Sequence, residues 1–125
     1  MKNKINKNRK YALIFGISGQ DGAYLASYLL NKNYQIIGTT RNNSKKNLFR
    51  LSRLGILDKV TIIKGEATDI FFCKGLIRKK INEIYYLAGD SSILSSFENP
   101  QKSLQSNTVG ILNILEIIKK KRLAI

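Results

Sequence analysis

Short uninterrupted runs of apolar residues alternate along this chain with longer segments in which apolar residues recur every three or four positions. Short apolar runs are typical of strands buried on both faces, and the three-to-four spacing is typical of helices with one apolar side. The pattern predicts strands at residues 11–16, 34–39, 60–64 and 83–88. It predicts helices at residues 21–31, 69–80 and 100–122, and a loop with one short helix at residues 43–57.

Strands and helices therefore alternate from residue 10 onwards. Such alternation implies right-handed crossovers between parallel strands, which place helices on both faces of the sheet. The predicted fold class is α/β, a Rossmann-like parallel sheet in a three-layer αβα arrangement. We assign residues 1–9 to a basic, flexible tail and residues 10–125 to one NAD(P)-binding Rossmann domain.

The alternating pattern is short for this fold class. Residues 123–125, Leu-Ala-Ile, are typical of the start of a fifth strand. Doubly wound dinucleotide folds, however, normally have two or more strands after the fourth. We therefore expect an incomplete domain, truncated after about four strands, as in a fragment or the product of a truncated gene. The alternative is that these residues are the frayed end of the last helix.

Composition limits the compartment in which the domain is expected and the kinds of site that it can contain. The chain has 125 residues, is 43% hydrophobic and contains one cysteine, Cys73, so it can bury a core and cannot form an internal disulfide. A reducing cytoplasm fits these numbers, and Cys73 is interpreted as a small core residue because it lies in an apolar run. The apolar run at residues 11–17 is too short for a signal peptide or a membrane span. There is no histidine, so the eight acidic residues and Cys73 form no metal-ligand pattern.

The net charge of +14 raises the alternative of a nucleic-acid-binding protein. The lysines, however, are spread over both ends and most predicted helices, and aromatic residues do not alternate with them as on a base-stacking surface. We therefore predict no nucleic-acid partner and attribute the charge to composition bias. The same charge would help to attract a phosphorylated ligand.

A glycine-rich segment lies where the first predicted strand meets the first predicted helix. Gly16, Gly19 and Gly22 have the spacing G-x-x-G-x-x-G, and this context favours a dinucleotide-binding turn over an ordinary strand-to-helix turn. Glycine lets the backbone approach a pyrophosphate closely, and the free N–H groups at the helix start face the phosphates. Asp21 lies at the start of this helix, where we expect its carboxylate to accept hydrogen bonds from free N–H groups and to turn away from the ligand.

The end of the second predicted strand indicates which dinucleotide is bound. An NAD-selective fold usually places an acidic residue there, where it binds the ribose 2′-hydroxyl. This chain has Arg41 and no acid nearby, and a guanidinium pairs well with a 2′-phosphate, so the sequence favours NADP. The alternative is a solvated loop arginine, and Lys45 and Lys46 would add to the attraction or stay solvated.

Several segments together carry a family resemblance: GISGQDGAYLASYLL, GTTR, KGEATD, EIYYLAGDSSILSSFENP and NTVGILNILE. From about residue 10 to residue 122 the chain resembles the N-terminal part of GDP-mannose 4,6-dehydratases, which belong to the extended short-chain dehydrogenase/reductase group. The segment G-x-x-G-Q-D-G-x-Y-L is fairly specific for this family, whereas the other segments are shared with other nucleotide-sugar enzymes. Another nucleotide-sugar epimerase or dehydratase, or a non-catalytic, decayed dinucleotide-binding protein, therefore stays as an alternative.

The resemblance implies a set of cofactor-binding positions. The glycine turn, with Gly16, Ser18, Gly19, Gln20, Asp21 and Gly22, would wrap the pyrophosphate of NADP, and Arg41 would contact its 2′-phosphate. Glu66 and Ala67, after the third strand, would lie near the adenine. Leu87, Ala88 and Ser91, after the fourth strand, would lie beside the ribose and nicotinamide. The chain departs from the family at Asn42, where a second arginine is frequent, and at Asp90 and Ser92, where the family has glutamine and histidine.

The resemblance also implies a reaction. Family members oxidise the sugar of GDP-mannose at C4, eliminate water across C5 and C6, and return the hydride to C6, with a Tyr-x-x-x-Lys pair and a Ser/Thr-x-Glu motif as catalytic groups. Tyr28 and Lys32 have the tyrosine–lysine spacing, but we interpret them as a surface pair on the first helix. No catalytic residue is assigned, because the family's catalytic motifs are expected beyond Ile125, and we expect negligible turnover from these residues alone. The resemblance implies GDP-mannose as the substrate and a homo-oligomer at full length.

Overall fold

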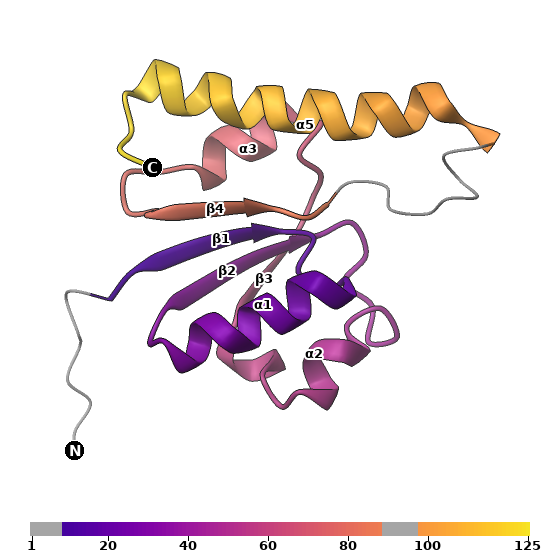
Figure 1. Ribbon diagram of the computed structural model, residues 1–125, viewed down its shortest axis with the longest axis vertical. Helices are drawn as coiled ribbons and strands as arrows, with labels where there is room; N and C mark the ends of the chain where they lie inside the picture. The colour runs from indigo at the N-terminus through magenta and orange to yellow at the C-terminus, as the bar shows by residue number, and fades with distance from the viewer. Residues whose placement is uncertain (1–8, 89–97) are drawn as a thin grey trace.

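The computed structural model describes residues 9–88 and 98–125, which form a four-stranded parallel sheet with helices on both faces (Figure 1). The strands follow the order β3-β2-β1-β4 across the sheet. Phe15, at the end of β1, pairs with Thr39 on β2 and with Tyr86 on β4, so the carboxyl ends of the strands meet at one edge. The predicted α/β fold class is confirmed. The strands are β1 (Tyr11–Phe15), β2 (Gln35–Thr40), β3 (Thr61–Lys64) and β4 (Glu83–Tyr86).

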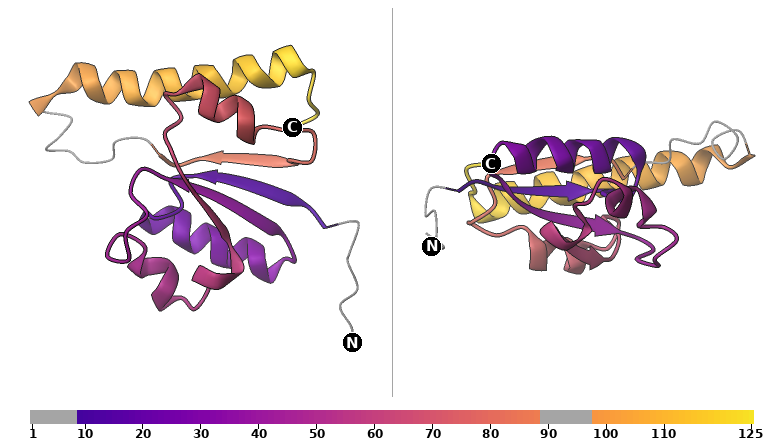
Figure 2. Two further views of the ribbon diagram at one scale, coloured as in Figure 1. Left: turned by 180° about the vertical axis from the view of Figure 1, so that it is seen from behind. Right: turned by 90° about the horizontal axis from the view of Figure 1, so that it is seen from below.

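The helices lie in two layers, one on each face of the sheet (Figure 2). Helices α1 (Gln20–Asn31) and α2 (Phe49–Arg53) cover one face, with a 3₁₀ turn, η1 (Leu57–Lys59), leading into β3. Helices α3 (Ile70–Leu76) and α5 (Pro100–Lys121) cover the other face. No helix in the described residues is both long and apolar enough to cross a membrane.

The central strand β1 explains why both faces are covered. Ala12 and Ile14 point into the core beneath α1 and α2, whereas Leu13 and Phe15 point into the core beneath α3 and α5. All four residues are fully buried, as the uninterrupted apolar run predicted. A charged residue anywhere in residues 12–15 would therefore be buried without a partner.

Two predicted elements differ from the structure by more than two residues. The helix predicted at residues 69–80 ends at Leu76, because Ile77 turns to an extended conformation and the chain buries Ile77 and Ile81 in the second core on its way to β4. The strand predicted at residues 123–125 does not form. Arg122 has φ +53°, and the N–H of Leu123 donates to the carbonyl of Ile118 at 3.0 Å, which ends α5 in a left-handed cap.

The predicted basic tail, residues 1–9, lies outside the described residues except for Arg9. The Nε of Arg9 donates to the carbonyl of Asn33 at 3.0 Å, and its Nη2 donates to the carbonyl of Tyr34 at 3.3 Å. Arg9 is thus attached to the turn between α1 and β2. The division of the chain into tail and domain stays a prediction.

Candidate functional site

The glycine turn between β1 and α1 starts at Gly16, where only glycine is tolerated. Gly16 has φ +89°, and a Cβ added there would lie 2.6 Å from the carbonyl oxygen of Leu87. The N–H groups of Gly16 and Ile17 both donate to the carbonyl of Thr39, each at 3.1 Å. The turn is therefore fixed against β2 on one side and against the segment after β4 on the other.

The other two glycines of the motif have different roles. A Cβ at Gly22 would lie 2.2 Å from the carbonyl oxygen of Gly16, so glycine there lets α1 pack directly on the turn. Gly19 is the N-cap of α1, and the nearest atom to a Cβ there is the Gly16 oxygen at 3.6 Å, an ordinary contact. Packing within the protein therefore explains why positions 16 and 22 are glycine. At Gly19, by contrast, a methyl group would only occupy space in a neighbouring cleft.

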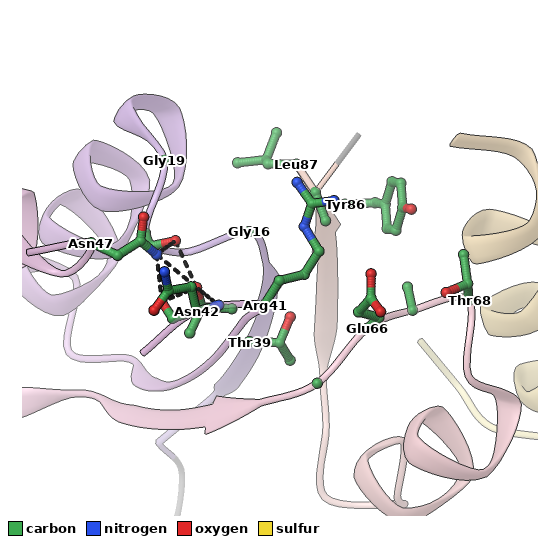
Figure 3. A pocket seen from close by; sticks show the side chains of 15 residues that line it. Gly16, Gly19, Thr39, Arg41, Asn42, Asn47, Glu66, Thr68, Tyr86 and Leu87 are labelled. Carbon is green, nitrogen blue, oxygen red and sulfur yellow. Dashed lines mark hydrogen bonds between the residues drawn. The ribbon is translucent and has the colours of Figure 1, made fainter. Parts of the chain in front are cut away.

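This cleft lies at the carboxyl ends of the four strands and has a volume of about 250 Å³ (Figure 3). It contains most of the positions that the sequence predicted as a cofactor site: Gly16, Ser18, Gly19, Arg41, Glu66, Ala67, Leu87 and Ala88. It is also lined by residues outside the predicted set of site residues: Thr39, Thr40, Asn42, Asn47, Gly65, Thr68 and Tyr86. Several of these lie at the ends of predicted strands, and the rule that parallel sheets bind ligands at that edge would have found them.

Four predicted site residues are not among those that line the cleft. Gln20 and Asp21 are exposed on the first turn of α1, and Gly22 is buried beneath it. Ser91, like Asp90 and Ser92, lies outside the described residues. The expected cap by Asp21 is wrong, because the N-cap is Gly19 and no side chain caps α1; Asp21 lies one residue inside the helix, where the helix dipole still favours its charge.

Arg41 is the cation of the cleft. It is exposed, follows β2 directly, and extends its side chain across the cleft toward Leu87 and Tyr86 (Figure 3). It forms no ion pair with any described residue. Glu66, after β3, is the one acidic residue among the described lining residues, so no acid stands at the end of β2.

A polar network joins the glycine turn to the loop after β2. The hydroxyls of Ser18 and Thr40 are hydrogen-bonded at 2.8 Å. The amide of Asn47 donates to both hydroxyls at 3.2 Å and also to the carbonyl of Asn42. The guanidinium of Arg50, on α2, donates to the carbonyl of Ser18 at 3.3 Å.

Tyr86 lines the cleft and packs against α5. Glycine at position 110 of α5 makes room for the Tyr86 hydroxyl, because a Cβ there would lie 2.2 Å from that oxygen. The side chain of Asn113 donates to the carbonyl of Ala67 at 2.9 Å, which attaches the segment after β3 to α5. Burial raises the pKa of Tyr86, so the residue is a neutral phenol at physiological pH.

The described lining of the cleft is suited to binding an anion. It combines a helix start, an arginine that forms no ion pair with a described residue, and a turn whose glycines leave the backbone accessible. Cys73 is fully buried in the second core, as predicted, and burial raises the pKa of its thiol to about 11. The described residues contain no group of acids, histidines and cysteines able to hold a metal ion.

The Tyr28–Lys32 pair lies away from the cleft, on the surface of α1. The Lys32 ammonium stands 5.5 Å from the centre of the Tyr28 ring, which is 59% exposed. Lys32 is the C-cap of α1, whereas the cleft lies at the opposite end of that helix. The interpretation of this pair as a surface feature is confirmed.

Comparisons with known proteins give one family. The model of the family described as GDP-mannose 4,6 dehydratase matches residues 13–124. The chain is 37% identical over 120 residues to GDP-mannose 4,6 dehydratase of Cricetulus griseus, covering 90% of this chain and 32% of the relative. It is 36% identical over 128 residues to GDP-mannose 4,6 dehydratase 2 of Caenorhabditis elegans, covering 96% and 34%. The chain thus spans about a third of the length of these curated relatives.

Solved structures share the fold at low sequence identity. A UDP-glucose-4-epimerase from Stenotrophomonas maltophila, with bound NAD and formylated UDP-arabinopyranose, superposes with a TM-score of 0.78 at 16% identity, over 92% of this chain and 35% of the other. The Bordetella bronchiseptica enzyme WbmH in complex with NAD+ superposes with a TM-score of 0.70 at 20% identity, over 92% and 37%. Both likenesses place the chain in the Rossmann-like fold of these enzymes.

Proposed function

This chain belongs to the GDP-mannose 4,6-dehydratase family, and from that premise we propose that its cleft binds NADP as the cofactor portion of such an enzyme. The observation that carries the proposal is the space beside Gly19. Gly16 and Gly22 are required by the protein's own packing, but a Cβ at Gly19 would enter only the cleft. Packing of the protein does not require glycine at position 19, but close approach of a pyrophosphate to the backbone does.

The described residues fit NADP along the cleft. The N–H groups at the start of α1, with Gly16, Ser18 and Gly19, would hold the pyrophosphate. Glu66 and Ala67 would lie by the adenine, and Leu87 and Ala88 by the nicotinamide side. Gln20, Asp21, Gly22 and Ser91 complete the proposed set, of which Ser91 lies outside the described residues.

Arg41 supports NADP over NAD. It extends across the cleft without an ion pair among described residues, and no acid at the end of β2 competes for the ribose 2′-hydroxyl. A guanidinium forms strong, charge-assisted hydrogen bonds with a phosphate. Asn42, where the family frequently has a second arginine, leaves Arg41 as the principal source of the preference.

The substrate of the whole protein is proposed to be GDP-mannose, as the names of the relatives state for them. NADP would accept a hydride from the sugar and return it within one cycle. The described residues bind and orient the cofactor, and none of them in the cleft is a tyrosine–lysine pair that could take the sugar's hydroxyl proton. The 125 residues alone should therefore form no 4-keto-6-deoxy sugar, which a product assay with GDP-mannose and NADP measures.

A cytoplasmic location and a homo-oligomer of the full-length protein are part of the same proposal. The buried thiol of Cys73, which forms no disulfide in the described residues, is compatible with a reducing compartment. The excess of positive charge would raise the local concentration of a phosphorylated cofactor and sugar nucleotide.

Titration of the purified chain with NADP and NAD tests the proposal. We expect NADP to bind at least about tenfold more tightly, because a charge-assisted hydrogen bond contributes about 1.5–3 kcal/mol. The variant Arg41→Ala should lose that preference while its NAD affinity stays within about threefold. Arg53→Ala, which removes an exposed arginine of α2 outside the cleft, is the matched control and should keep the preference.

Two results would contradict the proposal. Absence of binding to both dinucleotides would favour the alternative of a decayed, non-catalytic protein. An equal loss of NADP affinity in Arg41→Ala and Arg53→Ala would show that net charge, and not a contact at the 2′-phosphate, attracts NADP.

A further inference from the structure

Asn47 occupies a special place in the loop between β2 and α2. The residues from Arg41 to Lys46 are all exposed, whereas Asn47 is partly buried and lines the cleft. Its own backbone is held, since its N–H donates to the hydroxyl of Ser44 at 3.2 Å. Asn47 is therefore the first partly buried residue after a run of six exposed ones.

The side chain of Asn47 bonds to both neighbours of Arg41. Its Nδ2 donates to the Thr40 hydroxyl at 3.2 Å and to the Asn42 carbonyl (Figure 3). Arg41 lies between these two residues and has no hydrogen bond of its own to a described residue. The direction in which the guanidinium leaves the backbone thus depends on how residues 40 and 42 are held.

The same amide also bonds to the glycine turn. Nδ2 of Asn47 donates to the hydroxyl of Ser18 at 3.2 Å, and Ser18 lies 29 residues earlier in the chain. Of the described residues in the loop after β2, Asn47 is the one whose side chain reaches this turn. Together with the Ser18–Thr40 hydroxyl bond, this amide therefore fixes the distance between the proposed pyrophosphate site and the proposed 2′-phosphate site.

We propose that Asn47 is a positioning residue for dinucleotide preference: it holds Arg41 at the distance from the glycine turn that favours a 2′-phosphorylated dinucleotide over the unphosphorylated one. This inference rests on the proposed binding of NADP at the cleft. Asn47 should therefore affect the affinity for NADP but not that for NAD. NAD has no 2′-phosphate for Arg41 to bind, so it should bind nearly as well without the hydrogen bonds of the Asn47 side chain.

The chemistry of the three acceptors allows a selective variant. The hydroxyls of Ser18 and Thr40 can rotate and donate to a carboxylate, but the carbonyl of Asn42 cannot donate. Asn47→Asp keeps the size of the side chain and loses the bond to the Asn42 carbonyl, and a hydroxyl can donate to the new carboxylate only by giving up the bond that it now donates. Asn47→Ala removes all three bonds of the Asn47 amide. Asn43→Asp is the matched control, because it adds the same charge to an exposed position of the same loop.

The experiment is a titration of each variant with NADP and with NAD, alongside circular dichroism and thermal melting. We expect the ratio of NADP to NAD affinity to fall at least about tenfold in Asn47→Ala and Asn47→Asp, with NAD affinity changed by less than about threefold. Asn43→Asp should keep the ratio within about threefold of the native chain. If the alanine variant does not fold, the aspartate variant carries the test.

The outcomes separate this inference from the proposed function. A native chain that prefers NADP, with both Asn47 variants keeping the same ratio, would overturn the role of Asn47 and leave the cofactor site intact. An equal loss of NADP and NAD affinity, or failure of both variants to fold, would show that Asn47 is purely structural. A native chain that binds neither dinucleotide would overturn both proposals.

Discussion

The two ends of the parallel sheet both carry polar side chains, but they use them differently. At the carboxyl ends of the strands, the cleft of about 250 Å³ holds an arginine without an ion pair among described residues and the start of α1. At the amino ends lies a larger hollow of about 570 Å³, lined by Tyr28, Tyr34, Glu83 and Tyr85 among others. Size alone would select the end of the sheet opposite to the one that we propose as the cofactor site.

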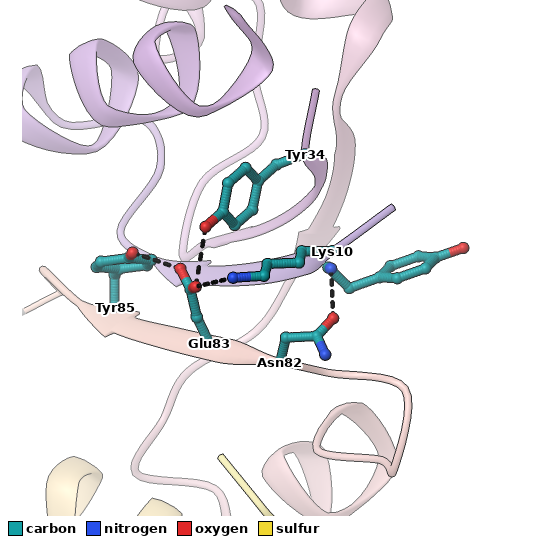
Figure 4. A network of polar contacts seen from close by, with 6 residues as sticks. Lys10, Tyr34, Asn82, Glu83 and Tyr85 are labelled. Atoms are coloured by element: carbon teal, nitrogen blue, oxygen red, sulfur yellow. Dashed lines mark hydrogen bonds and ion pairs between the residues drawn. The ribbon is translucent and has the colours of Figure 1, made fainter. Parts of the chain in front are cut away.

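The polar groups at the amino ends bond to one another (Figure 4). Glu83 accepts hydrogen bonds from the hydroxyl of Tyr85 at 2.6 Å and from the hydroxyl of Tyr34 at 2.9 Å, and pairs with Lys10 at 3.9 Å. Asn82 accepts from the backbone N–H of Tyr11 at 2.7 Å. The hydrogen bond to Glu83 is the main reason that the pKa of Tyr85 is raised to about 12.

The difference teaches how to recognise a ligand site in this fold. Polar groups that are matched within the protein stabilise it, and they gain little from a further ligand. Polar groups that stay unmatched beside a glycine that the packing does not require are free to bind one. The amino ends thus join β1, β2 and β4, whereas the carboxyl ends bind the cofactor in our proposal.

The largest effect is expected from Gly22→Ala, which would disrupt the packing of α1 on the glycine turn at the carboxyl ends of the strands. The added Cβ would lie 2.2 Å from the backbone oxygen of Gly16, which cannot move away without shifting α1. We expect the free energy of unfolding to fall by about 3 kcal/mol, measured by urea denaturation. Gly75→Ala, on α3 with nothing within 4 Å, is the control and should leave stability unchanged or raise it. Native stability of Gly22→Ala would show that packing does not require this glycine.

Gly19→Ala separates binding from folding at the same end. We expect the free energy of unfolding to fall by less than about 1 kcal/mol, because only the preference of the N-cap is lost. Affinity for NADP and NAD should both fall at least about tenfold, because the methyl group takes the space of the pyrophosphate. Isothermal titration calorimetry measures the affinities. Unchanged affinity for both dinucleotides would remove the main support for the cofactor site.

Glu83→Gln tests the amino ends, where the smallest effect is expected. The amide keeps one acceptor and loses the charge, so the free energy of unfolding at neutral pH should fall by about 1 kcal/mol. Dinucleotide affinity should not change. Glu116→Gln, at an exposed ion pair with Lys120 on α5, is the control and should change stability little.

The effect of Glu83→Gln should depend on pH in one direction. The hydrogen bond from Tyr85, followed by that from Tyr34, holds the pKa of Glu83 below its usual value of 4.5. The stabilisation is therefore present above 4.5 and is lost as the pH falls through the lowered pKa of the folded state. Melting curves from pH 7 to pH 3 should show a steeper loss for the native chain than for the variant. Parallel losses would contradict the role of this carboxylate.

The fold was predictable because its signals are local. The apolar run at residues 12–15 required burial on both faces, and the three-to-four spacing at residues 21–31 required a helix with one buried side. Errors arose where the tertiary context competes with local pattern. Ile77 and Ile81 fit a helix by spacing, but they are buried in an extended segment that leads into β4.

The candidate site was predictable only in part. The glycine spacing and Arg41 were visible because backbone approach and charge depend on residue type at one position. Asn47 and Tyr86 carried no such signal. An asparagine in a polar loop and a tyrosine in an apolar strand are ordinary residues until the fold shows what they contact.

By itself, the sequence determined the order of strands and helices, the glycine turn and the cation that follows the second strand, since each depends on short-range pattern or on one residue's chemistry. Only the tertiary structure decided that Gly19 alone of the three glycines has room for a Cβ, and that Asn47 reaches Ser18. Those facts depend on distances between segments far apart in the chain. Such distances are fixed by how the strands end beside one another and how α1 packs on the turn.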